Sequence, residues 1–279
     1  MPDHTSVARQ HAELLASVAE TTLRAGQMAF WWFGQITYLL KMGQTTVLCD
    51  PYLQPHERRN KPPLLTPAEC AGIDLMVCTH DHTDHIDPWA IPQLAEQTQA
   101  AFVAPRAVRQ RMLDLGVPES RLVAMNAGET VTLGDVSLTA VASAHEFLDR
   151  TADGLYPYLG YIVRGNGVTA YTTGDTVWWE GLQATLAAEL PIDVAFVPIN
   201  GRDAERYRRN CIGNMTFAEA CDLVSMLPVG LAVPAHFDMF DGNREDPTRF
   251  TEYCSAKYPD QRWWLGPAGE PVVVSARGA

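Results

Sequence analysis

A nine-residue stretch, 79–87, carries a dense set of side chains that bind metal ions. Its sequence is THDHTDHID, and it follows the apolar run 73–78, which predicts a buried strand that ends where the polar cluster begins. Histidines two residues apart point the same way from an extended segment, and an Asp-His pair just beyond can reach a second point a few ångströms away. This geometry suits two adjacent metal ions. A solvated polar loop is the alternative, but so many imidazoles have little structural use there.

Further polar residues stand at the ends of other predicted strands. Imidazole and carboxylate ligands suit zinc, iron or manganese, and the absence of cysteine from the set argues against a purely structural zinc site. Two ions a few ångströms apart would hold a bridging hydroxide, because bound water then has a pKa of about 7. One partition places His80, His82 and His145 on one ion, places Asp84, His85 and His236 on the other, and lets Asp175 bridge both.

Two aspartates receive individual roles. Asp84 is the predicted catalytic residue, which orients the hydroxide while it ligates the second ion, and its alternative role is that of a ligand alone. Asp50 ends a strand and is interpreted as a hydrogen-bond partner of a ligand histidine. The three histidines outside the set, His4, His11 and His56, are interpreted as solvated.

The segment 202–209 contains four arginines in eight residues of a chain whose net charge is −12. Because it follows a strand end, it should lie above the same edge as the metal ligands and could hold a phosphate or carboxylate. The alternative is a solvated helix face in which Asp203 and Glu205 pair with the arginines.

Strands and helices alternate along the chain in two blocks, which predicts two packed sheets with helices outside. Residues 1–27 are expected to form an N-terminal helical extension, and residues 28–279 the domain that contains the two sheets. The predicted strands are 28–33, 36–41, 45–49, 73–78, 101–104, 121–125, 130–133, 136–142, 158–164, 168–173, 192–199, 231–234, 262–265 and 271–275. The predicted helices are 6–24, 89–97, 105–115, 182–190, 216–227 and 247–257.

Composition limits the classes of partner. The chain has 279 residues, of which 47% are hydrophobic, so it can bury a full core. A net charge of −12 and a pI near 5.0 disfavour a nucleic acid polymer as partner. No segment has the ~20 apolar residues that cross a bilayer, and no signal pattern opens the chain, so we expect a cytoplasmic protein without a membrane partner. The six cysteines form no Cys-x-x-Cys pair and are predicted to be buried free thiols.

Four motifs in this order resemble the metallo-β-lactamase superfamily: THDHTDH at 79–85, His145, Thr-Gly-Asp at 173–175 and Pro-Ala-His at 234–236. The resemblance implies an α/β fold, the four-layer αββα sandwich, with a dinuclear metal site along the sheet edges. Its finer features are similar to the L-ascorbate-6-phosphate lactonase-like subgroup: FWWFG at 30–34, NGRD at 200–203, NCIGNMT at 210–216 and PAHFDMF at 234–240.

The subgroup implies two divalent ions, zinc or manganese, a sugar-acid lactone as substrate and assembly into a homo-oligomer. It also directs attention to Asn200, Arg202, Asp203 and Asn214 as substrate-binding residues. The first hypothesis is therefore a metal-dependent hydrolase that uses a metal-bridging hydroxide to open a small anionic lactone or ester. The alternatives are a phosphodiesterase that acts on small phosphodiesters or cyclic nucleotides, and a non-catalytic metal-binding scaffold.

Overall fold

Two β-sheets form the centre of the protein, for which a computed structural model describes residues 4–277, with side chains from residue 9 onward. One sheet has seven strands in the order β13-β1-β2-β3-β4-β5-β6, and the other has six in the order β12-β11-β10-β9-β8-β7. The seven-stranded sheet comprises β1 (Gln27–Trp32), β2 (Tyr38–Met42), β3 (Thr45–Cys49), β4 (Leu75–Val77), β5 (Ala101–Pro105), β6 (Leu122–Met125) and β13 (Pro271–Ser275). The six-stranded sheet comprises β7 (Thr130–Leu133), β8 (Val136–Ala142), β9 (Leu159–Gly165), β10 (Val168–Thr172), β11 (Val194–Pro198) and β12 (Leu231–Ala235).

Alternate residues of the seven-stranded sheet enter two different hydrophobic cores. Phe30 and Tyr38 point toward the other sheet, and both rings pack against Phe196 of β11 at centroid distances of 5.1 and 4.0 Å. Trp31 and Phe102 belong to a separate core on the opposite face. Because both faces of these strands are buried, their sequences are almost continuously apolar rather than alternating.

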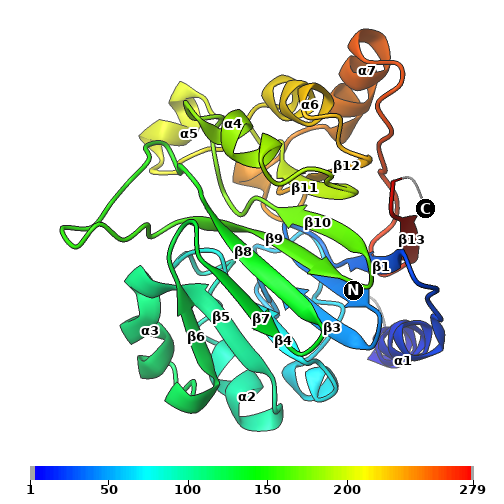
Figure 1. Cartoon of the computed structure of the whole chain (residues 1–279). Coiled ribbons are helices and arrows are strands. Elements are labelled where there is room, and N and C mark those ends of the chain that lie inside the picture. The colour runs from blue at the N-terminus through cyan, green and yellow to red at the C-terminus, as the bar shows by residue number, and fades with distance from the viewer. Residues whose placement is uncertain (1–3, 278–279) are drawn as a thin grey trace.

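Helices cover the outer faces of both sheets (Figure 1). The core that contains Trp31 also includes side chains of α2 (Ala90–Gln97) and α3 (Arg109–Asp114). On the six-stranded side lie α4 (Leu182–Ala187), α6 (Phe217–Met226) and α7 (Pro247–Lys257), and the short α5 (Ala204–Arg208) lies toward one end (Figure 1). This arrangement confirms the predicted αββα sandwich.

The N-terminal helix α1 (His4–Glu20) packs on the seven-stranded sheet. Leu14 is buried in the outer core, and the Trp31 indole donates a hydrogen bond to Ser17 Oγ at 2.9 Å. Lys41 of β2 donates to the carbonyl of Val18 at 2.7 Å, near the end of the helix. The helix therefore covers part of the sheet face.

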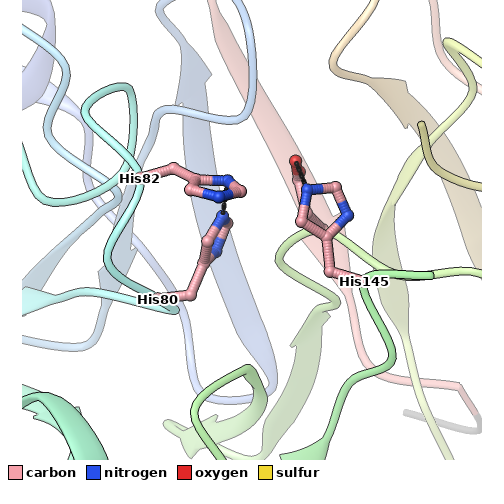
Figure 2. Close-up of side chains that lie close together, drawn as sticks. His80, His82 and His145 are labelled. Atoms are coloured by element: carbon pink, nitrogen blue, oxygen red, sulfur yellow. Dashed lines mark hydrogen bonds and ion pairs between the residues drawn. The ribbon is translucent and has the colours of Figure 1, made fainter. Parts of the chain in front are cut away.

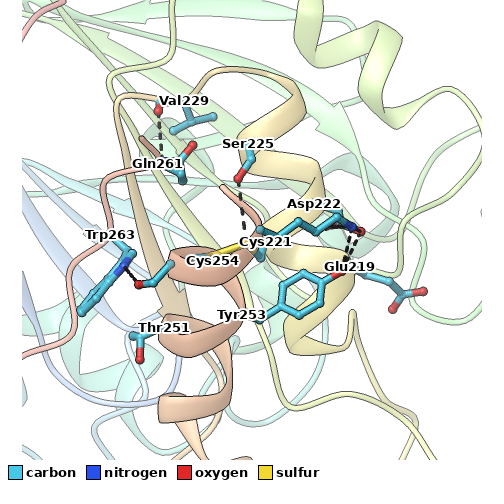
Figure 3. The surroundings of a disulfide bond; sticks show 12 residues. Glu219, Cys221, Asp222, Ser225, Val229, Thr251, Tyr253, Cys254, Gln261 and Trp263 are labelled. Carbon is cyan, nitrogen blue, oxygen red and sulfur yellow. Dashed lines mark hydrogen bonds and ion pairs between the residues drawn. A yellow bond between two sulfur atoms is a disulfide. The ribbon is translucent and has the colours of Figure 1, made fainter. Parts of the chain in front are cut away.

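Two predictions about cysteine and histidine are wrong in part. Cys221 of α6 and Cys254 of α7 form a disulfide, with their Cα atoms 5.8 Å apart (Figure 3), whereas all six cysteines were predicted to be free. His11 is buried rather than solvated, and its Nδ1 lies 3.0 Å from Glu69 Oε2. His56 is exposed as predicted, and the side chain of His4 lies outside the described residues.

The predicted strand 262–265 is also not formed. Trp263 makes a single isolated bridge to Ala232 of β12. The other predicted elements are present, most with ends shifted by a few residues.

Candidate metal centre

The seven predicted metal-binding side chains reach one place because four strands end there. In the seven-stranded sheet, β4 is followed by the histidine-rich turn 79–85. In the six-stranded sheet, β8, β10 and β12 run in the same direction, and His145, Asp175 and His236 follow their carboxyl ends. The structure thus gathers side chains from both sheets at one shared edge.

Four of these side chains form what we call the first cluster: His80, His82, His145 and Asp175. One nitrogen or oxygen atom from each lies within 4.8 Å of the others. His80 Nε2 is 2.9 Å from His82 Nδ1, and His145 Nε2 is 3.8 Å from Asp175 Oδ2. Figure 2 shows His80 and His82 together, with His145 facing them from a different segment of the chain.

The remaining three side chains, Asp84, His85 and His236, form the second cluster, also within 4.8 Å of one another. Asp175 reaches this cluster with its other oxygen, since Oδ1 lies 3.4 Å from His85 Nε2 and 3.2 Å from His236 Nε2. One carboxylate therefore presents one oxygen to each cluster, which is the arrangement required of a bridging ligand.

Asp50 contacts His85 of the second cluster. This contact is the one expected of a hydrogen-bond partner of a ligand histidine. Its carboxylate accepts hydrogen bonds from the backbone and hydroxyl of Thr79 at 2.8 Å each, and lies 2.9 Å from His85 Nδ1. With its Nδ1 held by Asp50, His85 points its Nε2 into the cluster, where it can bind a cation once its proton is displaced. The contact makes Asp50 a hydrogen-bond partner of His85, and the role of His85 as a metal ligand stays a prediction.

Gln35 is a member of the site that the sequence analysis missed. It lies in the turn between β1 and β2, is 1% exposed and has a positive φ of 53°. Its side-chain amide donates to Asp84 Oδ2 at 2.8 Å and lies 3.1 Å from His236 Nε2. Its backbone N–H donates to Asp238 Oδ1 at 2.9 Å, which fixes the turn. In the sequence, Gln35 stands out only as a polar residue between two apolar strands, and this pattern could have marked it as a candidate.

The donor set fits divalent cations. Among the described residues, four buried atoms of the centre lack a partner in hydrogen-bond geometry, namely His85 Nε2, His145 Nδ1, His236 Nδ1 and Asp175 Oδ1, although Asp175 Oδ1 lies within ion-pair distance of His85 Nε2. A buried polar atom without a partner costs roughly 1–3 kcal/mol. His85 Nε2 and Asp175 Oδ1 face the middle of the centre, where a cation would satisfy both. Nitrogen and carboxylate oxygen donors suit zinc, manganese or iron.

The histidines of the first cluster are uncharged at neutral pH. Burial lowers the pKa of His145 to about 4, against the opposing effect of the Asp175 carboxylate. Burial also lowers the pKa of His80 and of His82. These three imidazoles therefore keep their lone pairs available for a cation at neutral pH.

The histidines of the second cluster are protonated at neutral pH, in contrast to those of the first. Burial works to lower the pKa of His236, but the carboxylates of Asp175 and Asp84 outweigh it and raise that pKa to about 9. The pKa of His85 is likewise raised, because the charges of Asp175, Asp50 and Asp84 outweigh its burial. The histidines in turn hold the pKa of Asp84 and of Asp175 below the usual range, despite burial. Without a cation, this cluster holds protons.

Two of the predicted substrate-binding residues are buried in a network of amides. Asn214 donates to Asn200 Oδ1 at 3.1 Å, and Asn200 donates to Asn243 Oδ1 at 2.8 Å. Both asparagines are fully buried and connect the segment after β11 to the segment after β12. Their contact with a substrate stays a prediction.

The two charged residues predicted to bind substrate also have partners within the protein. Arg202 forms two hydrogen bonds to the Glu219 carboxylate, each of 2.7 Å, and one to the carbonyl of Asn214. Asp203 caps α5 by accepting from the backbone N–H groups of Glu205 and Arg206. An anionic substrate would have to compete with the Arg202–Glu219 pair, so the role predicted for Arg202 stays a prediction.

Comparison with known proteins identifies relatives along most of the chain. The family model described as "Beta-lactamase superfamily domain" matches residues 45–237. A protein of Opitutus terrae named a UPF0173 metal-dependent hydrolase is 29% identical over 225 residues, which cover 80% of this chain and 90% of the relative. A protein of the same name from Pyrobaculum islandicum is 28% identical over 230 residues, or 82% of this chain and 92% of the relative.

A solved structure shares the fold. Igni18 of Ignicoccus hospitalis, described as a metallo hydrolase, superimposes with a TM-score of 0.68 at 21% identity, over 88% of this chain and 98% of that one. At this identity the likeness concerns the fold. In the part of the chain that the structure describes, no helix is long and apolar enough to cross a membrane.

Proposed function

The chain belongs to the metallo-β-lactamase superfamily, and on that premise we propose that it is a metal-dependent hydrolase that opens a small lactone or ester. The anionic group of the first hypothesis is left out of the proposal, because Arg202, which was expected to bind it, is paired with Glu219. The observation that carries the proposal is the pair of adjoining clusters with Asp175 between them. His80, His82 and His145 would hold one divalent ion, and Asp84, His85 and His236 the other. Such ions would supply Lewis acidity and a water nucleophile that is active at neutral pH.

The protein's own groups would orient the reacting water. Asp84 is the more accessible carboxylate of the centre, since its side chain is 19% exposed and that of Asp175 is 4% exposed. Its lowered pKa keeps it ionised, so it can accept a hydrogen bond from water on the solvent side. Gln35 holds one oxygen of the same carboxylate and so fixes its direction.

The names of the two relatives support hydrolysis as the reaction class. The lactone or ester as substrate rests on the resemblance of the 30–34, 200–216 and 234–240 segments to the lactonase-like subgroup. We propose zinc or manganese as the ions and a homo-oligomer as the assembly on the same ground.

A metal-loaded substrate panel tests the proposal. Protein reconstituted with manganese or zinc, and the His82→Ala variant as control, would be assayed on neutral lactones, phosphorylated sugar lactones, carboxylic esters, bis-p-nitrophenyl phosphate and a cyclic nucleotide. We expect the lactones or esters to be hydrolysed by the loaded protein only, and not by the variant. Faster cleavage of the phosphodiesters would replace the proposal by a phosphodiesterase. Equal turnover by the variant would contradict the metal assignment.

A further inference from the structure

The ring of Tyr158 contacts all three histidines of the first cluster. Its centroid lies 5.3 Å from that of His80, 6.1 Å from that of His82 and 5.5 Å from that of His145. The corresponding angles between the ring planes are 50°, 64° and 70°, so the rings meet at an incline rather than face to face. Aromatic rings at such distances and angles attract one another, and each contact restricts the rotation of an imidazole.

The backbone of Tyr158 is attached to both segments that carry these histidines. Tyr158 ends the loop between β8 and β9, and its carbonyl accepts from the N–H of Ser143, just before His145, at 3.0 Å. The N–H of Leu159 donates to the carbonyl of Thr79, at the start of the histidine-rich turn, also at 3.0 Å. Thr79 comes after a strand of the seven-stranded sheet, and Ser143 after a strand of the six-stranded sheet. The ring therefore lies where both sheets contribute ligands to the first cluster.

Core packing does not account for this ring. Among the described residues, Tyr156, two positions earlier in the same loop, packs against the core between the two sheets, whereas neither core includes Tyr158. Tyr158 is half-buried, and its aromatic neighbours are the polar imidazoles of the first cluster. The position of the ring is therefore explained by the histidines rather than by the hydrophobic cores.

Hydrogen bonds give less support to the first cluster than to the second. In the part of the chain that the structure describes, His145 Nδ1 has no hydrogen-bond partner. Asp50 and Gln35 each form a hydrogen bond with a side chain of the second cluster. The ring contacts of Tyr158 are the counterpart of these hydrogen bonds in the first cluster.

We propose that Tyr158 is a positioning residue of the metal centre, whose ring holds the three imidazoles of the first cluster in the orientation that binds a cation. The inference rests on the metal site of the proposed function, and it does not depend on the reaction. It assigns the role to the ring, because the contacts with the histidines are contacts between rings. A ligand that is already oriented loses less freedom when the cation binds, so the affinity is higher.

Calorimetric titration with manganese measures the effect one cluster at a time. In the full chain with His236→Asn only the first cluster keeps all of its ligands, and in the full chain with His82→Ala only the second does. We expect Tyr158→Leu to weaken binding about 10- to 100-fold in the His236→Asn background, as is typical for loss of a residue that supports metal ligands. In the His82→Ala background it should change binding by less than about threefold, because its ring contacts belong to the first cluster.

Two further variants in the His236→Asn background show which part of the side chain acts. Tyr158→Phe retains the ring and should keep the affinity of the first cluster within about threefold. Tyr156→Leu is the matched control, because it also removes a half-buried tyrosine ring from the loop, where Arg150 lies over that ring at 4.5 Å. It should lower the temperature of thermal unfolding but leave manganese binding unchanged.

Each result supports or overturns the role of Tyr158. Weaker binding by Tyr158→Leu in the His236→Asn background alone, together with retained binding by Tyr158→Phe, supports it. Unchanged binding by Tyr158→Leu, or equal weakening in both backgrounds, would overturn it, and so would a loss in Tyr158→Phe as large as that in Tyr158→Leu. Should circular dichroism show that Tyr158→Leu is unfolded, Tyr158→Met, which has an unbranched side chain, is titrated in its place.

The same titrations separate this inference from the proposed function. A parent chain that binds neither manganese nor zinc would reject the metal centre and, with it, both proposals. A parent chain that binds manganese, with no effect of Tyr158→Leu, would reject the role of Tyr158 and leave the proposed hydrolase as it stands.

Discussion

The two halves of the metal centre differ in how the surrounding protein holds them. In the second cluster, His85 is fixed by the Asp50 carboxylate, and Asp84 by the Gln35 amide. In the first cluster, His80 Nδ1 is 3.0 Å from the hydroxyl of Thr79, and His145 Nδ1 has no hydrogen-bond partner among the described residues. Carboxylate support increases the basicity of an imidazole, so the two halves should bind cations with different affinity and pH dependence.

The two clusters differ in charge as well as in the hydrogen bonds that support their histidines. The first cluster has neutral imidazoles at pH 7 and can accept a cation without losing a proton. The second cluster has more carboxylate but also protonated histidines, so a cation must displace protons there. At neutral pH, protons therefore compete with a cation for the histidines of the second cluster. We expect a cation to bind to the first cluster first.

The largest expected effect comes from removing one imidazole from each half. We expect His82→Ala and His236→Asn each to lower kcat/KM for the best substrate by about a thousandfold or more, since both clusters are needed to activate water. Asparagine is chosen at residue 236 because His236 has a left-handed φ of 58°, which asparagine tolerates. Elemental analysis of the purified variants should show one metal equivalent less in each. Loss of activity in one variant alone would indicate a mononuclear enzyme.

Metal binding should depend on pH differently at the two clusters. Because His236 keeps its proton up to a pKa of about 9 and the pKa of His85 is raised as well, binding at the second cluster should tighten at least about tenfold per pH unit between pH 7 and 9. At the first cluster the pKa of His145 is about 4, so binding there should be nearly independent of pH above about 6.

Calorimetric titration with manganese at several pH values would resolve the two sites. Repeating it in buffers of different ionisation enthalpy would count the protons that are released. A single pH dependence shared by both sites would contradict the division into a neutral and a protonated half.

A smaller effect is expected when the support of the second cluster is weakened. Asp50→Asn keeps the size of the side chain and suits the positive φ of 43° at this position. It removes the charge that orients His85, so the second cation should bind about 10- to 100-fold more weakly. The first cation should bind almost as in the parent chain, and equal weakening at both sites would show that Asp50 acts on the whole centre.

The smallest effect is predicted for Gln35. Gln35→Asn retains an amide that tolerates the left-handed backbone, but its shorter side chain withdraws the amide from Asp84. The second cation should bind roughly tenfold more weakly, as expected for loss of one supporting contact. Manganese titration followed by electron paramagnetic resonance would measure this change. An unaltered affinity would make Gln35 a structural residue of the turn alone.

The sequence could predict the fold and the seven side chains of the centre for one physical reason. Apolar runs that end in polar residues mark strand ends, and ends of parallel strands in one sheet meet at one edge. His145, Asp175 and His236 are far apart in the chain, yet each follows such a run. Their role as metal ligands is a prediction that the structure makes geometrically reasonable.

Features that depend on how elements pack could not be read in this way. Gln35 reaches Asp84 because the β1–β2 turn crosses the end of β12, where the His236 N–H donates to the Gln35 carbonyl at 2.9 Å. Cys221 and Cys254 lie on two helices whose relative position no local pattern specifies. The Arg202–Glu219 pair likewise requires the segment after β11 to lie against the start of α6.

The disulfide between α6 and α7 closes a covalent ring around the segment that contains His236. Its cysteines are 33 residues apart, and β12 and His236 lie between them (Figure 3). A ring of this length removes freedom from the unfolded chain that corresponds to roughly 3 to 4 kcal/mol. His236 is therefore held partly by chain topology, whereas Asp84, His85 and the histidines of the first cluster lie outside the ring.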